Sequence, residues 1–280
     1  IRIGNPTFSS LHRQIFIKDS SYYYIDRLDD LIISENDSVS CLMSSDSLLI
    51  ELPPELGLEW VDGLPGASLS RGSIDYIDSL TFRINIDEED LQPGDSVIVN
   101  GLPINNISEV GESYIKLFPK GRNNHKDIVD INKISIANPK FELREPPFND
   151  YLFFPNDTTR TLNDIWIYED WVPGITEIRD VYIRIQDIAE FEFDTTYAST
   201  EISINGSSDI DTVDLYYYND FTLRLDIPFD LAGGDTLKIH RLWVTNFRET
   251  NLGPYQPFKV SAKLKNSFSV LYVDTPHTMV

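Results

Sequence analysis

Cysteine is almost absent from this sequence, with a single residue, Cys41, among 280. A lone cysteine cannot form an internal disulfide, so any fold must be stable without one. Because Cys41 alternates with the apolar residues Val39 and Met43, we expect it to be a small buried thiol. Long hydrophobic runs are missing too: no stretch approaches the roughly 20 apolar residues that span a bilayer. Direct insertion into a membrane is therefore not expected.

Basic residues are scarce relative to acidic ones, with 23 Lys and Arg against 45 Asp and Glu and a net charge of −22. Nucleic acids and anionic membranes are bound through basic faces that displace counterions, so neither is an expected partner. The acidic residues are spread along the whole chain. This distribution favours solubility and repulsion between neighbouring molecules, or the retention of divalent cations.

Motifs for catalysis are missing as well. The sequence has no G-x-S-x-G elbow and no glycine-rich phosphate loop. Neighbouring carboxylates such as Glu169 and Asp170 have the chemistry of a glycosidase, but chance neighbours are common in an acidic chain. The four histidines are far apart and in no metal-binding spacing: His12, His125, His240 and His277. We expect no enzymatic activity, no catalytic residue and no organic cofactor.

What the sequence does contain is an internal repeat. The segment Leu80–Ile86 reappears in pattern as Phe221–Ile227, and Pro93–Val97 reappears as Gly233–Leu237. An apolar residue three positions before a proline marks the phase at Pro6, Pro139 and Pro276. The spacing predicts two modules, 1–137 and 138–280, with a third repeat starting near residue 273. Arrays of this kind are typical of scaffolds, and we expect the chain to be a segment of a longer protein.

Alternation of apolar and polar residues predicts strands throughout. In Leu80–Ile86 every second residue is apolar, and β-branched and aromatic residues are frequent elsewhere. Glycine-containing turns such as Pro93-Gly94-Asp95 separate the predicted strands. The sequence therefore predicts an all-β fold of two tandem antiparallel β-sandwich (Ig-like) modules. A short proline-containing junction, beginning at Asn138-Pro139 and continuing through Leu143–Pro147, is expected to join them.

Calcium is the one cofactor that the composition leaves open, because it accepts about six to eight oxygen ligands from flexible loops. Acidic residues cluster in two stretches, and the candidate ligands are Asp87, Glu88, Asp90, Asp95, Asp209, Asp211 and Asp214. Neither stretch matches the D-x-[DN]-x-[DN]-G loop, and the two occupy different places in the repeat. A solvated acidic loop is the alternative interpretation.

Aromatic residues offer possible contact surfaces. Two tyrosine runs, 22–24 and 216–218, accompany four tryptophans, of which we expect Trp166 and Trp243 to be exposed. Exposed aromatic side chains stack on sugars or anchor protein–protein contacts. Core packing is the alternative, because half of any run on a strand points inward.

The second module has a characteristic order of motifs, in 180–185, 191–194, 204–206, 221–227, 229–235 and 242–247, which residues 3–135 follow more faintly. In this order the module resembles a β-sandwich repeat of very long bacterial secreted and cell-surface proteins. Arg241 departs from the pattern, since the family usually has the glycine that the first module keeps as Gly101. A second departure is Gln186-Asp187, which replaces a proline that the first module keeps at Pro53-Pro54.

This resemblance implies a non-enzymatic structural repeat of an extracellular bacterial surface protein, forming part of a stalk, fibre or filament. Neighbouring copies or further repeats are then the expected partners. The alternatives are an adhesin or carbohydrate-binding module that contacts glycans or a host or neighbour cell surface, and an accessory region of a large secreted enzyme.

Overall fold

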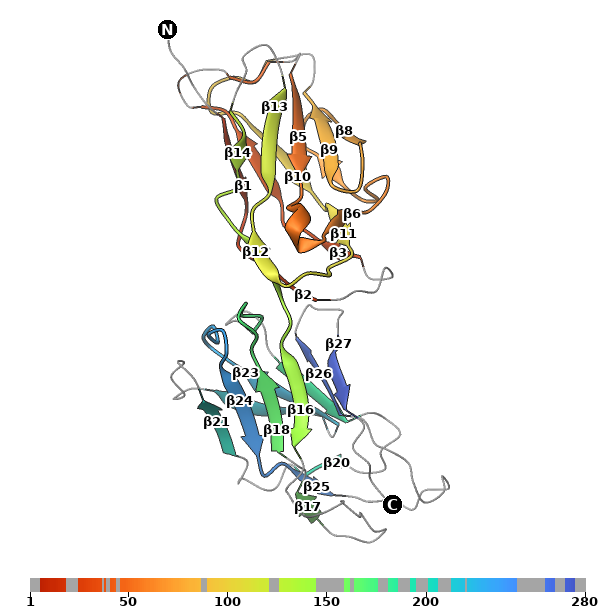
Figure 1. The fold of residues 1–280 in the computed structure, drawn as a ribbon, viewed down its shortest axis with the longest axis vertical. Coiled ribbons are helices and arrows are strands. Elements are labelled where there is room, and N and C mark those ends of the chain that lie inside the picture. Colours follow the sequence, from red (N-terminus) through yellow and green to blue (C-terminus); the bar gives the residue numbers. More distant parts are fainter. Residues whose placement is uncertain are drawn as a thin grey trace. The chain divides into compact units, whose positions relative to one another are not determined.

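The structure is a computed structural model of the 280-residue chain. It describes residues 6–18, 25–36, 38, 41–43, 46–86, 90–120, 126–144, 159–161, 164–175, 181–185, 192–194, 201–205, 213–219, 221–245, 260–264 and 270–274. The chain forms two compact units, unit 1 (Ile1–Ile136) and unit 2 (Ala137–Val280). In Figure 1, unit 1 runs from red to yellow-green and unit 2 from green to blue.

Unit 1 is built on two larger antiparallel sheets and two small ones. The four-stranded sheet has the order β1 (Thr7–Ser10), β4 (Leu31–Ser34), β10 (Ser96–Asn100), β7 (Ser68–Leu69). The five-stranded sheet has the order β14 (Ile128–Val129), β13 (Lys116–Lys120), β5 (Ser47–Glu51), β9 (Thr81–Asn85), β8 (Ser73–Tyr76). The small sheets are β3 (Asp26–Arg27), β11 (Pro103–Asn105), β6 (Glu59–Trp60) and β12 (Gly111–Ser113), β15 (Ile134–Ala137), β2 (Gln14–Ile17).

Unit 2 has three antiparallel sheets among its described residues. Its four-stranded sheet has the order β16 (Lys140–Arg144), β18 (Asp164–Tyr168), β24 (Thr236–His240), β21 (Glu201–Asn205). Its five-stranded sheet has the order β22 (Asp214–Asn219), β23 (Thr222–Asp226), β19 (Val181–Ile185), β26 (Val260–Leu264), β27 (Val270–Asp274). The small sheet is β17 (Thr159–Thr161), β25 (Trp243–Thr245), β20 (Glu192–Phe193).

The strands of the two units are connected in the same order. In unit 1, β5 is flanked by β9 and β13; in unit 2, β19 is flanked by β23 and β26. Likewise β4 lies between β1 and β10, and β18 lies between β16 and β24. The small sheets β3-β11-β6 and β17-β25-β20 follow the same rule.

The burial pattern explains why these segments form strands. In β9, Phe82 and Ile84 are fully buried while their neighbours are half-buried, and in β23 Leu223 and Leu225 are buried in the same way. A strand with one apolar face gains stability when that face is covered. In unit 1, one hydrophobic cluster contains buried residues of both larger sheets, so these sheets enclose a common core.

The prediction of an all-β fold with antiparallel sheets is confirmed. Beside the strands, the described residues contain one short 3₁₀ helix, η1 (Pro54–Leu56), and no helix long and apolar enough to span a membrane. The prediction that Cys41 is buried is confirmed too.

Trp60 is the largest side chain of the unit 1 core. Its ring meets Phe82 edge-on at a centroid distance of 5.0 Å, and its indole N–H donates a hydrogen bond to the Leu80 carbonyl at 2.8 Å. Phe193 has the corresponding place in unit 2, since Trp60 pairs with β11 and Phe193 pairs with β25. An aromatic residue thus fills the core at this position in both units.

Two segments lie elsewhere than the sequence predicted. Leu143 and Arg144, expected to continue the junction, are the end of β16 and pair with β18. Val273 and Asp274, expected to open a third repeat, belong to β27 and pair with β26. In both cases the ladder hydrogen bonds of a sheet within unit 2 satisfy the backbone.

Candidate functional site

Of the calcium candidates, the structure describes Asp90, Asp95 and Asp214; the other four, Asp87, Glu88, Asp209 and Asp211, lie outside the described residues. Asp95 accepts hydrogen bonds from the Gln92 N–H at 2.9 Å and from Arg71 at 3.4 Å. Asp214 accepts one from the Tyr216 hydroxyl at 3.3 Å. Across the described ranges, no group of three or more His, Cys, Asp or Glu is arranged to hold a metal ion.

Asp95 and Asp235 have the same structural role in the two units. Asp235 Oδ2 accepts the Ala232 N–H at 3.0 Å, as Asp95 Oδ2 accepts the Gln92 N–H. Each side chain therefore closes the tight turn that precedes β10 or β24. The glycine before each aspartate, Gly94 or Gly234, has φ +87°, a conformation that glycine adopts without steric cost.

Each of these turns is bonded to a buried glutamate. The Glu35 N–H donates to the Asp95 carbonyl at 2.8 Å, and the Glu169 N–H donates to the Asp235 carbonyl at 2.9 Å. Both glutamates directly follow equivalent strands, β4 and β18, and both side chains are almost completely buried. The sequence does not reveal them, because nothing local distinguishes a buried glutamate from an exposed one in so acidic a chain.

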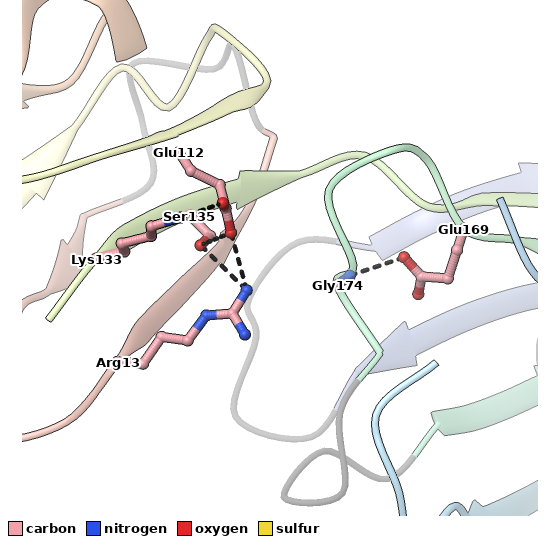
Figure 2. Close-up of polar contacts among 6 residues, drawn as sticks. All are labelled: Arg13, Glu112, Lys133, Ser135, Glu169 and Gly174. Carbon is pink, nitrogen blue, oxygen red and sulfur yellow. Dashed lines mark hydrogen bonds and ion pairs between the residues drawn. The ribbon is translucent and has the colours of Figure 1, made fainter. Parts of the chain in front are cut away.

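Both glutamate carboxylates organise the loop that follows them. Glu169 accepts the N–H groups of Gly174 and Ile175, each at 2.7 Å, and the first of these bonds is drawn in Figure 2. Glu35 accepts the N–H groups of Cys41, at 2.8 Å, and Leu42. Glu169 was considered above, with Asp170, as a glycosidase carboxylate. In the structure its buried side chain instead binds the backbone of the following loop.

The environment of Glu169 changes its acidity. Burial raises the pKa of this carboxyl to about 7, since desolvation disfavours the charged form. The two backbone N–H donors act in the opposite direction, and the nearby carboxylates of Asp170 and Asp235 raise the pKa further. Its charge state therefore changes near neutral pH.

A second polar cluster joins β12, β15 and the segment before β2 in unit 1. Figure 2 shows Glu112 accepting hydrogen bonds from Arg13 at 3.0 Å, Lys133 at 2.9 Å and Ser135 at 3.0 Å. The hydrogen bond from Lys133 lowers the pKa of Glu112, and the same contact raises the pKa of Lys133. The carboxylate oxygens of Glu112 accept from these three donors, so the cluster links β12 to β15 and to the segment before β2.

The tryptophans are not exposed as predicted. Trp166 and Trp243 are half-buried, whereas Trp171 is 64% exposed. Trp171 lies in the loop that Glu169 anchors, a position that strand alternation cannot predict. The tyrosines at 22–24 lie outside the described residues, and Tyr216 is exposed.

A group of polar and aromatic side chains lies on the outer face of the four-stranded sheet of unit 2. We call this group the Trp166 face; it consists of Glu142, Arg144, Asp164, Trp166, Tyr168, Ser203, Lys238 and His240. The sheet register places Glu142, Trp166, Lys238 and Ser203 side by side on successive strands. The alternate residues of β18 and β24 are buried on the opposite face.

Trp166 is at the centre of this face. The Arg144 guanidinium lies 3.8 Å and the Lys238 ammonium 3.9 Å from the centroid of its ring. Both distances are within the range of cation–π attraction. The Trp166 indole N–H is buried and has no hydrogen-bond partner among the described residues.

Glu142 holds the neighbouring side chains in place. Its Oε2 accepts hydrogen bonds from Arg144 Nε at 3.2 Å and from the Tyr168 hydroxyl at 2.8 Å. Burial and the bond to Glu142 raise the pKa of Tyr168, so its hydroxyl stays a donor at neutral pH.

A hydrogen-bonded chain crosses three strands of the same face. His240 Nδ1 lies 2.8 Å from Asp164 Oδ2, and His240 Nε2 lies 3.2 Å from Ser203 Oγ. These distances suit a nucleophile, base and carboxylate, but the carboxylate of a hydrolytic triad is buried. The Asp164 side chain is 41% exposed, so we infer that these hydrogen bonds only fix the orientation of the His240 ring. Sequence reasoning missed it because the three residues meet only through the sheet register.

The equivalent face of unit 1 has a different chemistry. Ser9, Ile32 and Ile98 occupy the register positions of Glu142, Trp166 and Lys238. Ser34 and Ser96 lie beside them, with hydroxyl oxygens 3.4 Å apart. The cations and the tryptophan are therefore features of unit 2 alone among these two faces.

Neither the known protein-family models nor the curated proteins give a match to this sequence. Solved structures are similar over nearly the whole chain. The Streptococcus agalactiae AgI/II polypeptide BspA C-terminal domain is 8% identical, with 94% of this chain and 96% of that chain covered and a TM-score of 0.43. The C-terminal domain of the Streptococcus pyogenes antigen I/II-family protein AspA is also 8% identical, with coverages of 99% and 98% and a TM-score of 0.42.

The collagen adhesin (CNA) from S. aureus is 9% identical over 99% of this chain and 92% of that chain, with a TM-score of 0.25. These identities and TM-scores are too low to assign the chain to a family or to support a function.

Proposed function

We propose that this chain is a non-enzymatic structural segment of an extracellular bacterial surface protein and forms part of a stalk, fibre or filament. The observation that carries the proposal is the agreement between the two units in strand order, in the aspartate-closed turn and in the buried glutamate after β4 or β18. Such agreement supports modules of one repeat, and repeats are a common way to build extended structural proteins.

Local rigidity supports a structural role. The buried side chains of Glu35 and Glu169 accept hydrogen bonds from loop N–H groups that solvent would otherwise contact. Loops fixed in this way cost less entropy when they contact a neighbouring module or copy. The resemblance of the sequence to repeats of secreted proteins supports the extracellular location.

Electron microscopy of the purified chain, with and without calcium, tests this proposal. Ordered fibres in which the modules repeat along the axis would support a filament subunit whose partners are further copies. Isolated particles under both conditions would contradict the filament proposal and favour a stalk or an adhesin. A change that calcium causes and magnesium does not would support the predicted calcium sites.

The second candidate function is an adhesin or carbohydrate-binding module, and the Trp166 face favours it. Its aromatic, cationic and hydroxyl groups are the side chains that recognise polar ligands at surfaces. A glycan array probed with the chain in multivalent form tests this candidate, and the absence of any signal would remove it. An accessory role beside the catalytic domain of a larger secreted enzyme is the third candidate, and the full reading frame tests it.

A further inference from the structure

We infer that the Trp166 face binds an acidic glycan, whose carboxylate or sulfate groups contact Arg144 and Lys238. This inference rests on the adhesive candidate above and names its ligand class. It concerns unit 2 alone, and it is independent of whether the chain assembles into fibres.

The first argument is the supply of positive charge. Arg144 is exposed, and its guanidinium is a planar fork that matches carboxylate and sulfate oxygens. It shares one N–H with Glu142, and the side chains of both are nearly half exposed, so its remaining donors are open to a ligand. Lys238 contacts the Trp166 ring, and within the described part of unit 2 no carboxylate forms an ion pair with it.

The second argument is the unpaired donor at the centre of the face. The buried Trp166 indole N–H lacks a partner among the described residues, and such groups in folded proteins require an explanation. The two cations that lie against the ring sit on long, flexible side chains. An anion that binds these cations beside the ring brings an acceptor close to this N–H.

The third argument distinguishes a glycan from other anions. Asp164, His240 and Ser203 add acceptors and donors beside the cations, and Tyr168 adds a hydroxyl. Sugar hydroxyl groups both donate and accept, so they match such a mixed surface. A peptide partner would instead use Trp166 as an apolar anchor, but Arg144 and Lys238 lie over its ring. A nucleic acid would need a wide basic surface, which a chain of net charge −22 lacks.

The overall negative charge does not prevent this contact. Exposed charges are screened over about 8 Å at physiological ionic strength, so distant carboxylates act weakly here. The two carboxylates of the face itself, Glu142 and Asp164, already contact Arg144 and Tyr168, and His240, respectively. The equivalent face of unit 1, with Ile32 and Ile98 in place of Trp166 and Lys238, provides an internal contrast.

Binding of the intact chain to defined glycans, measured by isothermal titration calorimetry, tests the inference. The probes are heparin oligosaccharides for sulfate, polygalacturonate oligosaccharides for carboxylate, and dextran as the neutral polymer. We expect at least one acidic probe to bind and dextran not to bind. Arg144→Ala and Lys238→Ala should each lower the affinity for the acidic probe about tenfold, as expected for loss of one charge-assisted hydrogen bond.

Lys120→Ala is the matched control. It removes the same charge from an exposed lysine of unit 1 that also lies over an aromatic ring, Phe118 at 5.8 Å. We expect it to bind like the parent chain. Lys238→Gln, which removes the charge but keeps most of the side chain, serves if Lys238→Ala does not fold, as judged by circular dichroism.

Three results would overturn the inference. They are no binding of either acidic probe, equal binding of dextran, and unchanged affinity in folded Arg144 and Lys238 variants. In the last case the cation–π contacts stabilise the sheet and nothing more. Binding of the sulfated probe alone or of the carboxylated probe alone supports the inference and identifies the source of the anion. Fibres in the microscope without glycan binding would leave the structural proposal standing while this one fails.

Discussion

Glu35 and Glu169 occupy the same position in the two units, directly after β4 and β18, and each buried carboxylate binds backbone N–H groups of the loop that follows. The N–H of each glutamate also binds the carbonyl of the aspartate that closes the turn before β10 or β24. One residue thus connects a strand end, a loop and a turn in each unit.

The pKa of Glu169 predicts a pH dependence of unit 2. A carboxyl whose folded pKa is about 7, raised from 4.5, contributes stability below pH 4.5 that is lost as the pH rises through 7. Glu169→Gln removes this titration. We expect the stability of the parent chain, relative to that of the variant, to fall by roughly 3 kcal/mol between pH 4.5 and 8.

Urea unfolding at several pH values, followed by tryptophan fluorescence, measures this difference. Glu142→Gln is the control, because it removes an exposed carboxylate from the same unit and keeps Glu169, so the fall in stability that Glu169 causes should persist. If the free energy of unfolding had the same pH dependence in the parent chain and in Glu169→Gln, the raised pKa of Glu169 would be contradicted.

Substitution of two glycines of unit 1 distinguishes the cost of a steric clash from the cost of a left-handed backbone conformation. Gly72 has φ +100°, and a Cβ there would lie 2.2 Å from the Asn85 carbonyl oxygen; Gly63 has φ +70° and open space around it. Gly63→Ala should cost about 1 kcal/mol for the left-handed conformation alone, and Gly72→Ala about 3 kcal/mol or more. Differential scanning calorimetry of both variants checks the order, and equal costs would count against the described turn at Gly72.

Arg241 has a left-handed backbone conformation, and the residue at the equivalent position of unit 1 is a glycine, Gly101. Its φ is +56°, close to the +68° of Gly101, and each residue directly follows an equivalent strand. Arg241→Gly and Arg241→Ala both lose the guanidinium, but only glycine relieves the left-handed conformation. We expect the glycine variant to be more stable than the alanine variant by about 1 kcal/mol in urea unfolding. Equal stability of the two variants would argue against this backbone geometry.

Trp60 should be the most sensitive aromatic position of unit 1. Trp60→Ala empties a fully buried site and should cost about 4 kcal/mol. Trp60→Phe introduces the residue that unit 2 has as Phe193. It removes the indole donor to the Leu80 carbonyl, which keeps the Leu52 N–H, and it leaves part of the site unfilled, so it should cost about 2 kcal/mol. Thermal unfolding by circular dichroism distinguishes the two, and a phenylalanine variant as unstable as the alanine variant would contradict the account.

Much of the fold could be predicted from the sequence. The period-2 patterns of Leu80–Ile86 and Phe221–Ile227 coincide with β9 and β23, and the glycine turns at Gly94 and Gly234 precede β10 and β24. These features are local, since alternation and left-handed turns depend only on residues close in the chain. The error at Leu143 and Arg144 arose because an extended strand and an extended linker look alike without their hydrogen-bond partners.

The candidate site was not predictable in the same way. Asp164, Ser203 and His240 meet only because β18, β24 and β21 pair in a particular register. Glu35 and Glu169 differ from the other described glutamates in their burial, and Trp171 is exposed in the loop that Glu169 anchors. None of these relationships leaves a short-range signal in the sequence.

By itself the sequence determined the strand class, the net charge of −22 that disfavours nucleic acids, and the turns whose backbone requires glycine. Only the tertiary structure decided which carboxylates are buried, which tryptophan is exposed, and which side chains gather around Trp166. The physical reason is that propensity and charge belong to the chain, whereas burial and cross-strand contact depend on which strands pair and in what register.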